Sequence, residues 1–207
     1  MSDDRERRLR TPEEIRALVG EPSATTPHKL LGELDETART FIARSPFLLL
    51  ATANASGYPD VSPKGDTPGF VHVEDTRTLL IPERKGNRLI LSLQNILANP
   101  SVAVLFVVPG TEETLRIQGQ AELLAGEAVT GRLVARGRSA LLAIRISVER
   151  CFFHCARSFK RAGLWKPAAW PEPVPVSFGR IIAAQLGRGE DLAREIDARV
   201  QKGYEDL

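Results

Sequence analysis

The side chains of one short turn are of the kinds that bind phosphate. Arg84, Lys85 and Arg88 follow an apolar segment that ends at Pro82, and Asn87 stands among them in position to cap a helix. That helix is predicted from apolar residues that recur at helical spacing, namely Leu89, Leu93, Ile96 and Leu97. A helix N-terminus presents unpaired backbone N–H groups and the positive end of the helix dipole, to which these cations would add their charge. The turn is therefore either an anion site or a solvated basic loop.

Composition restricts the class of protein that could carry this turn. The 207 residues suit a single domain with one core. Because 28 Lys and Arg stand against 26 Asp and Glu, the net charge of +2 gives no global field to attract nucleic acid or an anionic membrane. Aromatic residues make up 6%, which is few for a surface that stacks bases. These values disfavour a nucleic-acid module and make any anion site local.

The cysteines indicate a reducing compartment and no metal. Cys151 and Cys155 lie too close together to staple a long loop, and no apolar leader or span of about 20 residues is evident, so we expect a cytoplasmic protein. With His154 they form three potential ligands and no second cluster, which is a poor match for zinc spacing. His154 and Cys155 are therefore expected either to line a cleft or to pack.

Helices are predicted at both ends of the chain. Residues 1–10 are charged and expected to fray, after which Thr11, Pro12 and Glu14 form the pattern of a capping box that starts a helix ending at Gly20. A second amphipathic helix is predicted over 34–43, a third over 127–134, and two more over 177–186 and 190–204.

Strands are predicted between these helices. The apolar run 47–53 is short for a core helix and is followed by turn chemistry at 54–57, so 58–64 should return as its hairpin partner. Residues 69–73 and 77–81 form a second pair, and 101–108 is again apolar. Period-two alternation marks the strand around Leu115, Ile117, Ala121 and Leu123, and also 143–153.

Six or seven strands joined by hairpin-length links predict an antiparallel sheet. The sheet most economically closes into a barrel and so loses its edges, with one helix inserted between its fourth and fifth strands. The expected fold class is mainly β (α+β), a β-barrel with peripheral helices. Without a repeat or linker, we expect one domain over 1–207, comprising an N-terminal helical segment (1–45), the barrel core (46–165) and a C-terminal helical tail (166–207).

Several segments, in their order and spacing, resemble a known superfamily. They are Leu-Leu-Ala-Thr at 49–52, Gly-Tyr-Pro-Asp-Val-Ser-Pro-Lys-Gly-Asp at 57–66, Leu-Ile-Pro-Glu-Arg-Lys-Gly-Asn-Arg at 80–88, Asn-Pro at 99–100 and Glu-Thr-Leu-Arg-Ile-Gln-Gly-Gln-Ala at 113–121. Over 40–165 the chain resembles the flavin-binding split barrel of the pyridoxamine 5′-phosphate oxidase-like superfamily. It is most similar to a bacterial branch of flavin-binding proteins without known substrates, marked by Ser-Pro-Lys-Gly-Asp, by 152–159 and by Leu164-Trp165.

The resemblance implies FMN at the interface of a homodimer, with residues of both chains around each flavin. The strand Val61, Ser62, Pro63, Lys64 and Gly65 would face the ring and ribityl chain, and Ile81 and Pro82 would pass the ring. Arg84, Lys85, Asn87 and Arg88 fall in the phosphate-binding turn, and Thr114 stands where the oxidase has a glutamine that reaches the flavin. Either Trp165 or Trp170 would cover the flavin, or both pack.

Two implications concern charge. Lys64 would favour the anionic reduced flavin from the N1–C2 edge of the ring, the alternative being an exposed strand lysine. Arg157, Lys160 and Arg161 would either assist a phosphate held by the partner chain or form a solvated helix face.

The C-terminal segment departs from the oxidase. Instead of an Arg-x-His-type substrate motif the chain has Leu164-Trp165-Lys166-Pro167 and Trp170-Pro171, which argues against oxidation of pyridoxamine phosphate. We therefore expect an FMN-dependent oxidoreductase for another substrate. The alternative is a non-catalytic flavin binder, carrier or sensor, and the superfamily also includes deazaflavin- and haem-binding members.

Overall fold

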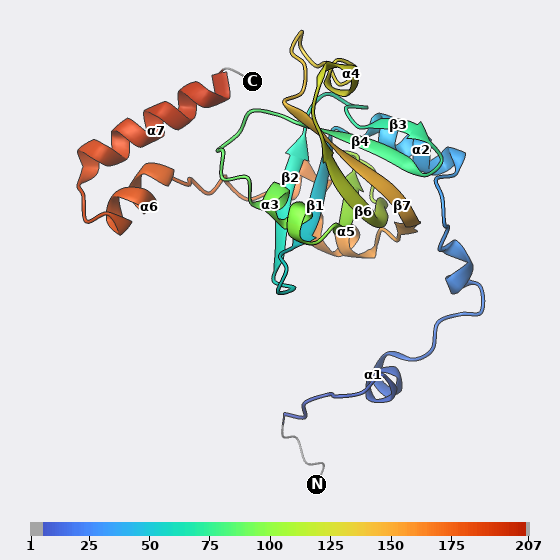
Figure 1. Cartoon of the computed structure of the whole chain (residues 1–207). Helices are drawn as coiled ribbons and strands as arrows, with labels where there is room; N and C mark the ends of the chain where they lie inside the picture. Colours follow the sequence, from blue (N-terminus) through green and yellow to red (C-terminus); the bar gives the residue numbers. More distant parts are fainter. Residues whose placement is uncertain (1–5, 206–207) are drawn as a thin grey trace. The chain divides into compact units, whose positions relative to one another are not determined.

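The computed structural model of the chain describes residues 6–205, so part of the predicted fraying segment 1–10 lies outside it. Internal contacts divide the chain into two compact units, residues 1–165 and 166–207. That the whole chain forms one domain stays a prediction. Figure 1 shows the elements of both units in chain order.

Seven strands form the sheet of the first unit: β1 (Phe47–Ala53), β2 (Pro59–Gly65), β3 (His72–Asp75), β4 (Thr78–Glu83), β5 (Ser101–Val107), β6 (Thr114–Leu124) and β7 (Leu142–His154). The helices of this unit are α1 (Pro12–Val19), η1 (Thr26–Lys29), α2 (Glu36–Arg44), α3 (Leu91–Ala98), α4 (Glu127–Thr130) and α5 (Arg157–Ala162). The second unit contains η2 (Pro167–Ala169), α6 (Phe178–Gln185) and α7 (Glu190–Glu205).

The sheet confirms the predicted fold class. Every pair of neighbouring strands is antiparallel, in the order β2-β1-β5-β6-β7-β4-β3. The terminal strands of this order, β2 and β3, are not hydrogen-bonded to each other, which makes the barrel a split one. Both predicted hairpins, β1–β2 and β3–β4, are present, and α3 is inserted between β4 and β5 as expected.

The barrel core follows from the alternation of side chains along the strands. Leu48 and Leu50 on β1 and Ile117 on β6 have no exposed surface, and on α2 the residues Ala38 and Ile42 pack into the same cluster. Helix α1 has the predicted capping box at Thr11, but none of its residues is buried. Burial of the apolar strand faces is therefore what holds this unit together.

An extra residue interrupts the pairing of β6 with β7. Gln118 lies opposite Arg150 and Gly119 opposite Val148. No residue of β6 therefore lies opposite Glu149, and β7 carries a bulge there. A Cβ atom on Gly119 would lie 2.0 Å from the carbonyl oxygen of Ser147, so only glycine fits there. The bulge changes the parity of β7, with Val148 buried before it and Cys151 buried after it.

Two helix predictions were wrong in extent. The helix after the basic turn begins at Leu91 rather than beside Asn87, and Leu89 and Leu97, predicted on its apolar face, are 60% and 77% exposed. The helix predicted over 127–134 ends at Thr130, and Gly131, whose backbone N–H donates to the carbonyl of Glu127, is its C-cap.

The second unit is a helical hairpin. Gly179 on α6 approaches α7 so closely that a Cβ atom there would lie 1.9 Å from the carbonyl oxygen of Ala193. Asp197 on α7 accepts hydrogen bonds from the hydroxyl of Ser177 at 2.5 Å and from the backbone N–H of Gly179 at 2.7 Å. These bonds lower the pKa of Asp197, the serine bond most of all. None of the described helices has the length and apolar character that a membrane span requires.

Candidate functional site

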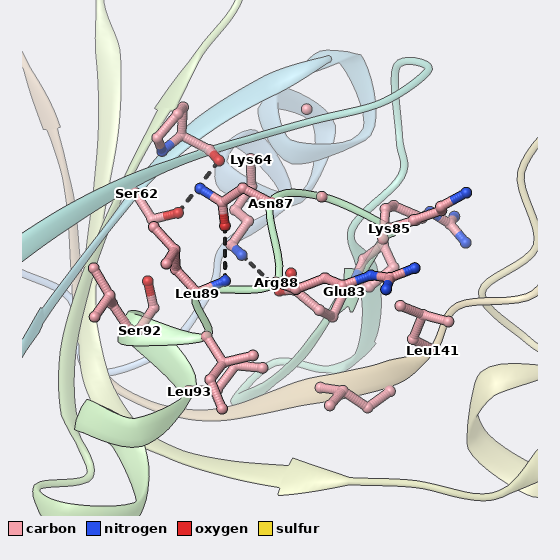
Figure 2. A pocket seen from close by; sticks show the side chains of 18 of the residues that line it. Ser62, Lys64, Glu83, Lys85, Asn87, Arg88, Leu89, Ser92, Leu93 and Leu141 are labelled. Carbon is pink, nitrogen blue, oxygen red and sulfur yellow. Dashed lines mark hydrogen bonds and ion pairs between the residues drawn. The ribbon is translucent and has the colours of Figure 1, made fainter. Parts of the chain in front are cut away.

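A cavity of about 750 Å³ lies where β2, the turn after β4 and the start of α3 meet. Figure 2 shows Ser62 and Lys64 of β2 on one side, the turn residues Glu83 to Arg88 beside them, and Leu141 on another side. This first cavity brings together most of the residues predicted to hold a flavin, and they are Val61, Ser62, Pro63, Lys64, Gly65, Pro82, Arg84, Lys85, Asn87 and Arg88.

The turn takes its shape from Asn87, but not in the predicted way. The Oδ1 atom of Asn87 accepts a hydrogen bond from the backbone N–H of Leu89 at 3.0 Å, a local turn, and so does not cap the helix. Arg88 and Ile90 adopt left-handed backbone conformations, with φ of 64° and 50°. Residues other than glycine adopt this conformation at a cost, and residues that adopt it cannot form a turn of a right-handed helix. The turn therefore lies along the cavity instead of forming the first turn of α3.

Two ion pairs fix the walls of the first cavity. The ammonium group of Lys64 lies 2.5 Å from a carboxylate oxygen of Glu83, and the two side chains are only 14% and 20% exposed. This result rules out the alternative of an exposed strand lysine. Arg84 donates to Asp66 at 2.9 Å and to the backbone carbonyls of Leu133 and Arg138. Arg84 therefore connects β2 to the segment after α4, and its donors are largely used within the protein.

The remaining cations of the turn are available to a ligand. Among residues 6–205, neither Lys85 nor Arg88 makes a hydrogen bond or an ion pair. Both line the first cavity, and both side chains are exposed. Their charges stand at the edge of the cavity, where an anionic group of a ligand would meet them.

The rim of the first cavity is apolar. Val61 on β2 and Leu141 before β7 are 57% and 65% exposed. Three consecutive residues of the turn, Leu89, Ile90 and Leu91, are between 52% and 60% exposed. Apolar side chains gathered around a cavity mark a surface that binds a ligand or another protein chain.

A second cavity, of about 380 Å³, lies on the outer face of the sheet beside α5. Its walls come from β5, β6, the end of β7 and α5, and its lining residues are Leu105, Thr114, Arg116, His154, Cys155, Arg157, Ser158, Phe159 and Arg161. Three of them are arginines, and no acidic side chain of the described chain lines this cavity.

His154 is the most unusual group of the second cavity. Its Nε2 atom is buried and has no hydrogen-bond partner within residues 6–205. Burial lowers the pKa of His154, and the charges of Arg116 and Lys29 lower it further. The imidazole is therefore neutral at pH 7, with one ring nitrogen unused.

The two cysteines near the C-terminal end of β7 differ. Cys151 is buried and donates from Sγ to the carbonyl of Glu33 at 3.0 Å, and burial raises the pKa of its thiol. Cys155 is exposed, and a hydrogen bond from the backbone of Arg157 lowers the pKa of its thiol. Only Cys155 is placed to meet a ligand of the second cavity.

Three residues predicted around the flavin lie outside the first cavity. Ile81 is fully buried in the barrel core, and Thr114 lines the second cavity. Trp165 donates from its indole nitrogen to the carbonyl of Thr111 at 2.8 Å, and its ring lies 5.8 Å from that of Phe159. Within one copy of the chain these residues do not join the basic turn.

Sequence reasoning missed the acids of the first cavity. Glu83 and Asp66 pair with two of the predicted cations, and both stand inside the segments that carry the family resemblance. An acid placed directly beside the predicted binding positions in both segments was a usable signal. Leu141 gave no such signal, because nothing in its sequence neighbourhood points toward the turn.

The fold and first cavity define a split-barrel protein whose cavity is lined by several cations. A family model described as pyridoxamine 5′-phosphate oxidase matches residues 34–155, more than half of the chain. The chain therefore belongs to this family, as its motifs predicted. Membership of this family supports the binding of a flavin, without naming a substrate.

Solved structures with a related arrangement share little sequence with the chain. HupZ from Group A Streptococcus is 23% identical, with a TM-score of 0.47, over 58% of this chain and 93% of that one. A Clostridium acetobutylicum protein related to general stress protein 26 is 16% identical, with a TM-score of 0.44, over 58% and 90%. An FMN-binding protein from Syntrophomonas wolfei is 11% identical, with a TM-score of 0.45, over 58% and 85%. No curated protein matches the chain.

Proposed function

We propose that this protein binds FMN in the first cavity and acts as a flavin-dependent oxidoreductase. The observation that carries the proposal is the pair of uncompensated cations, Lys85 and Arg88, at the edge of a cavity of about 750 Å³. A cavity of this size is within the range that holds cofactors, and a phosphate near a charge of −2 would compensate both cations.

Arg84 takes a different part in this proposal than Lys85 and Arg88. Its guanidinium already binds Asp66 and two carbonyls, so it supports the turn instead of the phosphate. Lys64 stands farther along β2 and would meet the ring or the ribityl chain, where its partner Glu83 moderates its charge. The chemistry that FMN supplies when bound is the transfer of electrons, and the residues of the cavity bind and orient it.

A second copy of the chain is part of the proposal. Members of the family are commonly dimeric flavin binders, and the exposed apolar rim of the first cavity is a surface that a second copy would cover. Thr114 and Trp165, which lie away from the basic turn in one copy, would then reach the flavin held by the other. A dimer in sedimentation experiments is the expected result.

Titration with FMN, followed by flavin fluorescence, tests the site. Replacing Arg88 with alanine should weaken FMN binding by about 10- to 100-fold, because one charge-assisted hydrogen bond contributes about 1.5–3 kcal/mol. Arg150→Ala is the matched control, since Arg150 is exposed on β7 and lines neither cavity. Equal affinities of the two variants would move the phosphate away from the turn.

The alternative function is a non-catalytic flavin carrier or sensor. It is favoured by one observation, the neutralisation of Lys64 by Glu83, which leaves less positive charge to stabilise a reduced flavin. Anaerobic addition of NADH or NADPH to the FMN-loaded protein distinguishes the two functions. Bleaching of the flavin absorption supports the oxidoreductase, and a flavin that resists both nicotinamides and other physiological reductants supports the carrier.

A further inference from the structure

We propose that the helical hairpin of the second unit associates with the same hairpin of a second copy of the chain. The unit comprises residues 166–207, and α6 and α7 are its two longer helices. A segment of this size rarely buries enough apolar surface to be stable alone, and association with another chain is one remedy. The proposal does not rest on the function of the first cavity, because no residue that lines that cavity belongs to this unit.

Small residues form the contact inside the hairpin. Gly179 and Ala183 of α6 are buried, and Ala193 of α7 is only 2% exposed. Gly179 and Ala183 are four residues apart, so they lie on the side of α6 that α7 approaches so closely. Figure 1 shows the two helices beside each other. This contact leaves out the large apolar side chains of α6.

Those large side chains form an apolar stripe along α6. They recur at spacings of one, three and four residues, they are 41–63% exposed, and they are Phe178, Ile181, Ile182 and Leu186. On α7 three half-buried apolar residues recur every four residues, and they are Leu192, Ile196 and Val200. Because the helices of a hairpin run in opposite directions, the helical spacing places this row on the same side of the hairpin as the stripe. We call these seven residues the hairpin face.

The charged side chains of α7 lie away from the hairpin face and compensate one another. Arg194 pairs with Asp191, and Arg199 lies 2.8 Å from Glu195. The residues 190–205 include five acids and three bases, so an anionic lipid surface would repel this helix. The hairpin face itself has no charged residue with which to select a charged partner. The occupant that it requires is an uncharged apolar surface, and the same face of a second copy provides one.

Two hairpins paired about a twofold axis would form a four-helix bundle. Each hairpin supplies two helices, and the hairpin faces become the inside of the bundle. Ala184 is exposed and lies about half a turn around α6 from Ile182, so it stays on the outside. Ala184 therefore offers a matched control position on the same helix.

Cross-linking of the full chain tests the proposal. Single cysteines are introduced along the stripe in a Cys155→Ser background, because Cys155 is exposed and would react itself. The variants are Phe178→Cys, Ile181→Cys, Ile182→Cys and Leu186→Cys. Side chains near a twofold axis meet their own counterparts. We therefore expect a short bismaleimide to join two copies in at least one variant at least ten times more efficiently than in Ala184→Cys.

A charge placed on the hairpin face gives a second measurement. Ile182→Glu would bury a carboxylate in the apolar inside of the bundle, so association of the chain in sedimentation equilibrium should weaken at least tenfold. Ala184→Glu places the same charge on the outside and should leave association unchanged. Circular dichroism checks that both variants keep their helices. If Ile182→Glu loses them, cross-linking of the cysteine variants decides alone.

Three results would overturn the proposal. One is cross-linking of every stripe variant at the level of Ala184→Cys. Another is stripe cysteines that stay shielded from a maleimide when the chain is diluted to a monomer, because the chain itself would then cover the face. A third is binding of the full chain to vesicles of phosphatidylcholine and phosphatidylserine without cross-linking, which would assign the face to lipid. All measurements are made without flavin, so a failure of FMN to bind would remove the function of the first cavity and leave this test intact.

Discussion

In the first cavity two of the lining cations have carboxylate partners, whereas in the second cavity none of the three lining arginines has one among the residues that the structure describes. The ion pairs of Lys64 and Arg84 join β2 to the turn after β4, so they hold the walls of the first cavity before any ligand arrives. The second cavity has no such internal compensation, and its arginines depend on solvent or a ligand. The comparison shows that similar side chains serve the structure in one place and remain available for binding in the other.

The largest expected effect is on stability, when one arginine is removed from each cavity and the losses of unfolding free energy are compared. Arg84→Ala leaves Asp66, which is 11% exposed, without its partner and two carbonyls without a donor, so we expect a loss of about 2–4 kcal/mol of unfolding free energy. Arg157→Ala removes an exposed guanidinium group that has no ion pair within residues 6–205, and it should change the free energy by less than about 0.5 kcal/mol. Urea unfolding measures both, and equal losses would remove the distinction between the cavities.

The ion pair of Lys64 with Glu83 should be visible in the reduction potential of bound FMN. A cation near the ring favours the anionic reduced flavin, so Lys64→Met should lower the two-electron midpoint potential by about 30 mV, a tenfold change in the equilibrium. Glu83→Gln frees the charge of Lys64 and should raise the potential by a similar amount. Potentials that move in the same direction in both variants would contradict the proposed place of the ring.

The smallest expected effect is the pH dependence of sulfate binding in the second cavity, where His154 titrates. Burial and the charges of Arg116 and Lys29 lower the pKa of His154, so it takes up a proton only below its ordinary value of 6.5. Protonation adds a cation, and a bound anion favours the protonated form, so sulfate affinity should rise about threefold as the pH falls from about 7.5 to about 5.5. Sulfate keeps its charge over this range.

Two variants assign that pH dependence to its source. His154→Gln should remove the rise, because the neutral side chain does not titrate. Cys155→Ser should keep it, since this change removes the thiol of Cys155, whose pKa is also lowered, and leaves the imidazole of His154 in place. A rise that survives His154→Gln would show that another group titrates.

The strands and their hairpins were predictable because their signals are local. The run Phe47–Ala53 and its turn at Asn54 determine a hairpin without reference to the rest of the chain, and the alternation of β6 reports which face is buried. The turn after β4 was predicted as a basic segment but given the wrong local structure. Asn87 has the same side chain whether it caps a helix or closes a turn, and the left-handed residues that follow it carry no distinctive residue type.

The contacts between distant segments were beyond local patterns. Lys64 and Glu83 come from strands that are not neighbours in the sheet, so their pairing depends on how the sheet curves. The separation of Thr114 from the basic turn has the same origin, since β6 carries it to the outer face beside α5. The quoted motifs indicated the residues of the first cavity through the family resemblance. For the second cavity the sequence left two alternatives open, that His154 and Cys155 line a cleft or pack, and that Arg157 and Arg161 assist a phosphate or form a solvated helix face; the structure places all four residues along that cavity.

Strand β7 supplies residues to both cavities, and its bulge lies between these residues. Leu142, at one end, lines the first cavity, and His154, at the other, lines the second, with the bulge at Glu149 between them. An insertion in a regular strand would turn every later side chain to the opposite face. In β7 the bulge at Glu149 absorbs the extra residue, so the buried residues before and after it follow separate alternations. The two ends of β7 therefore present their side chains to different cavities.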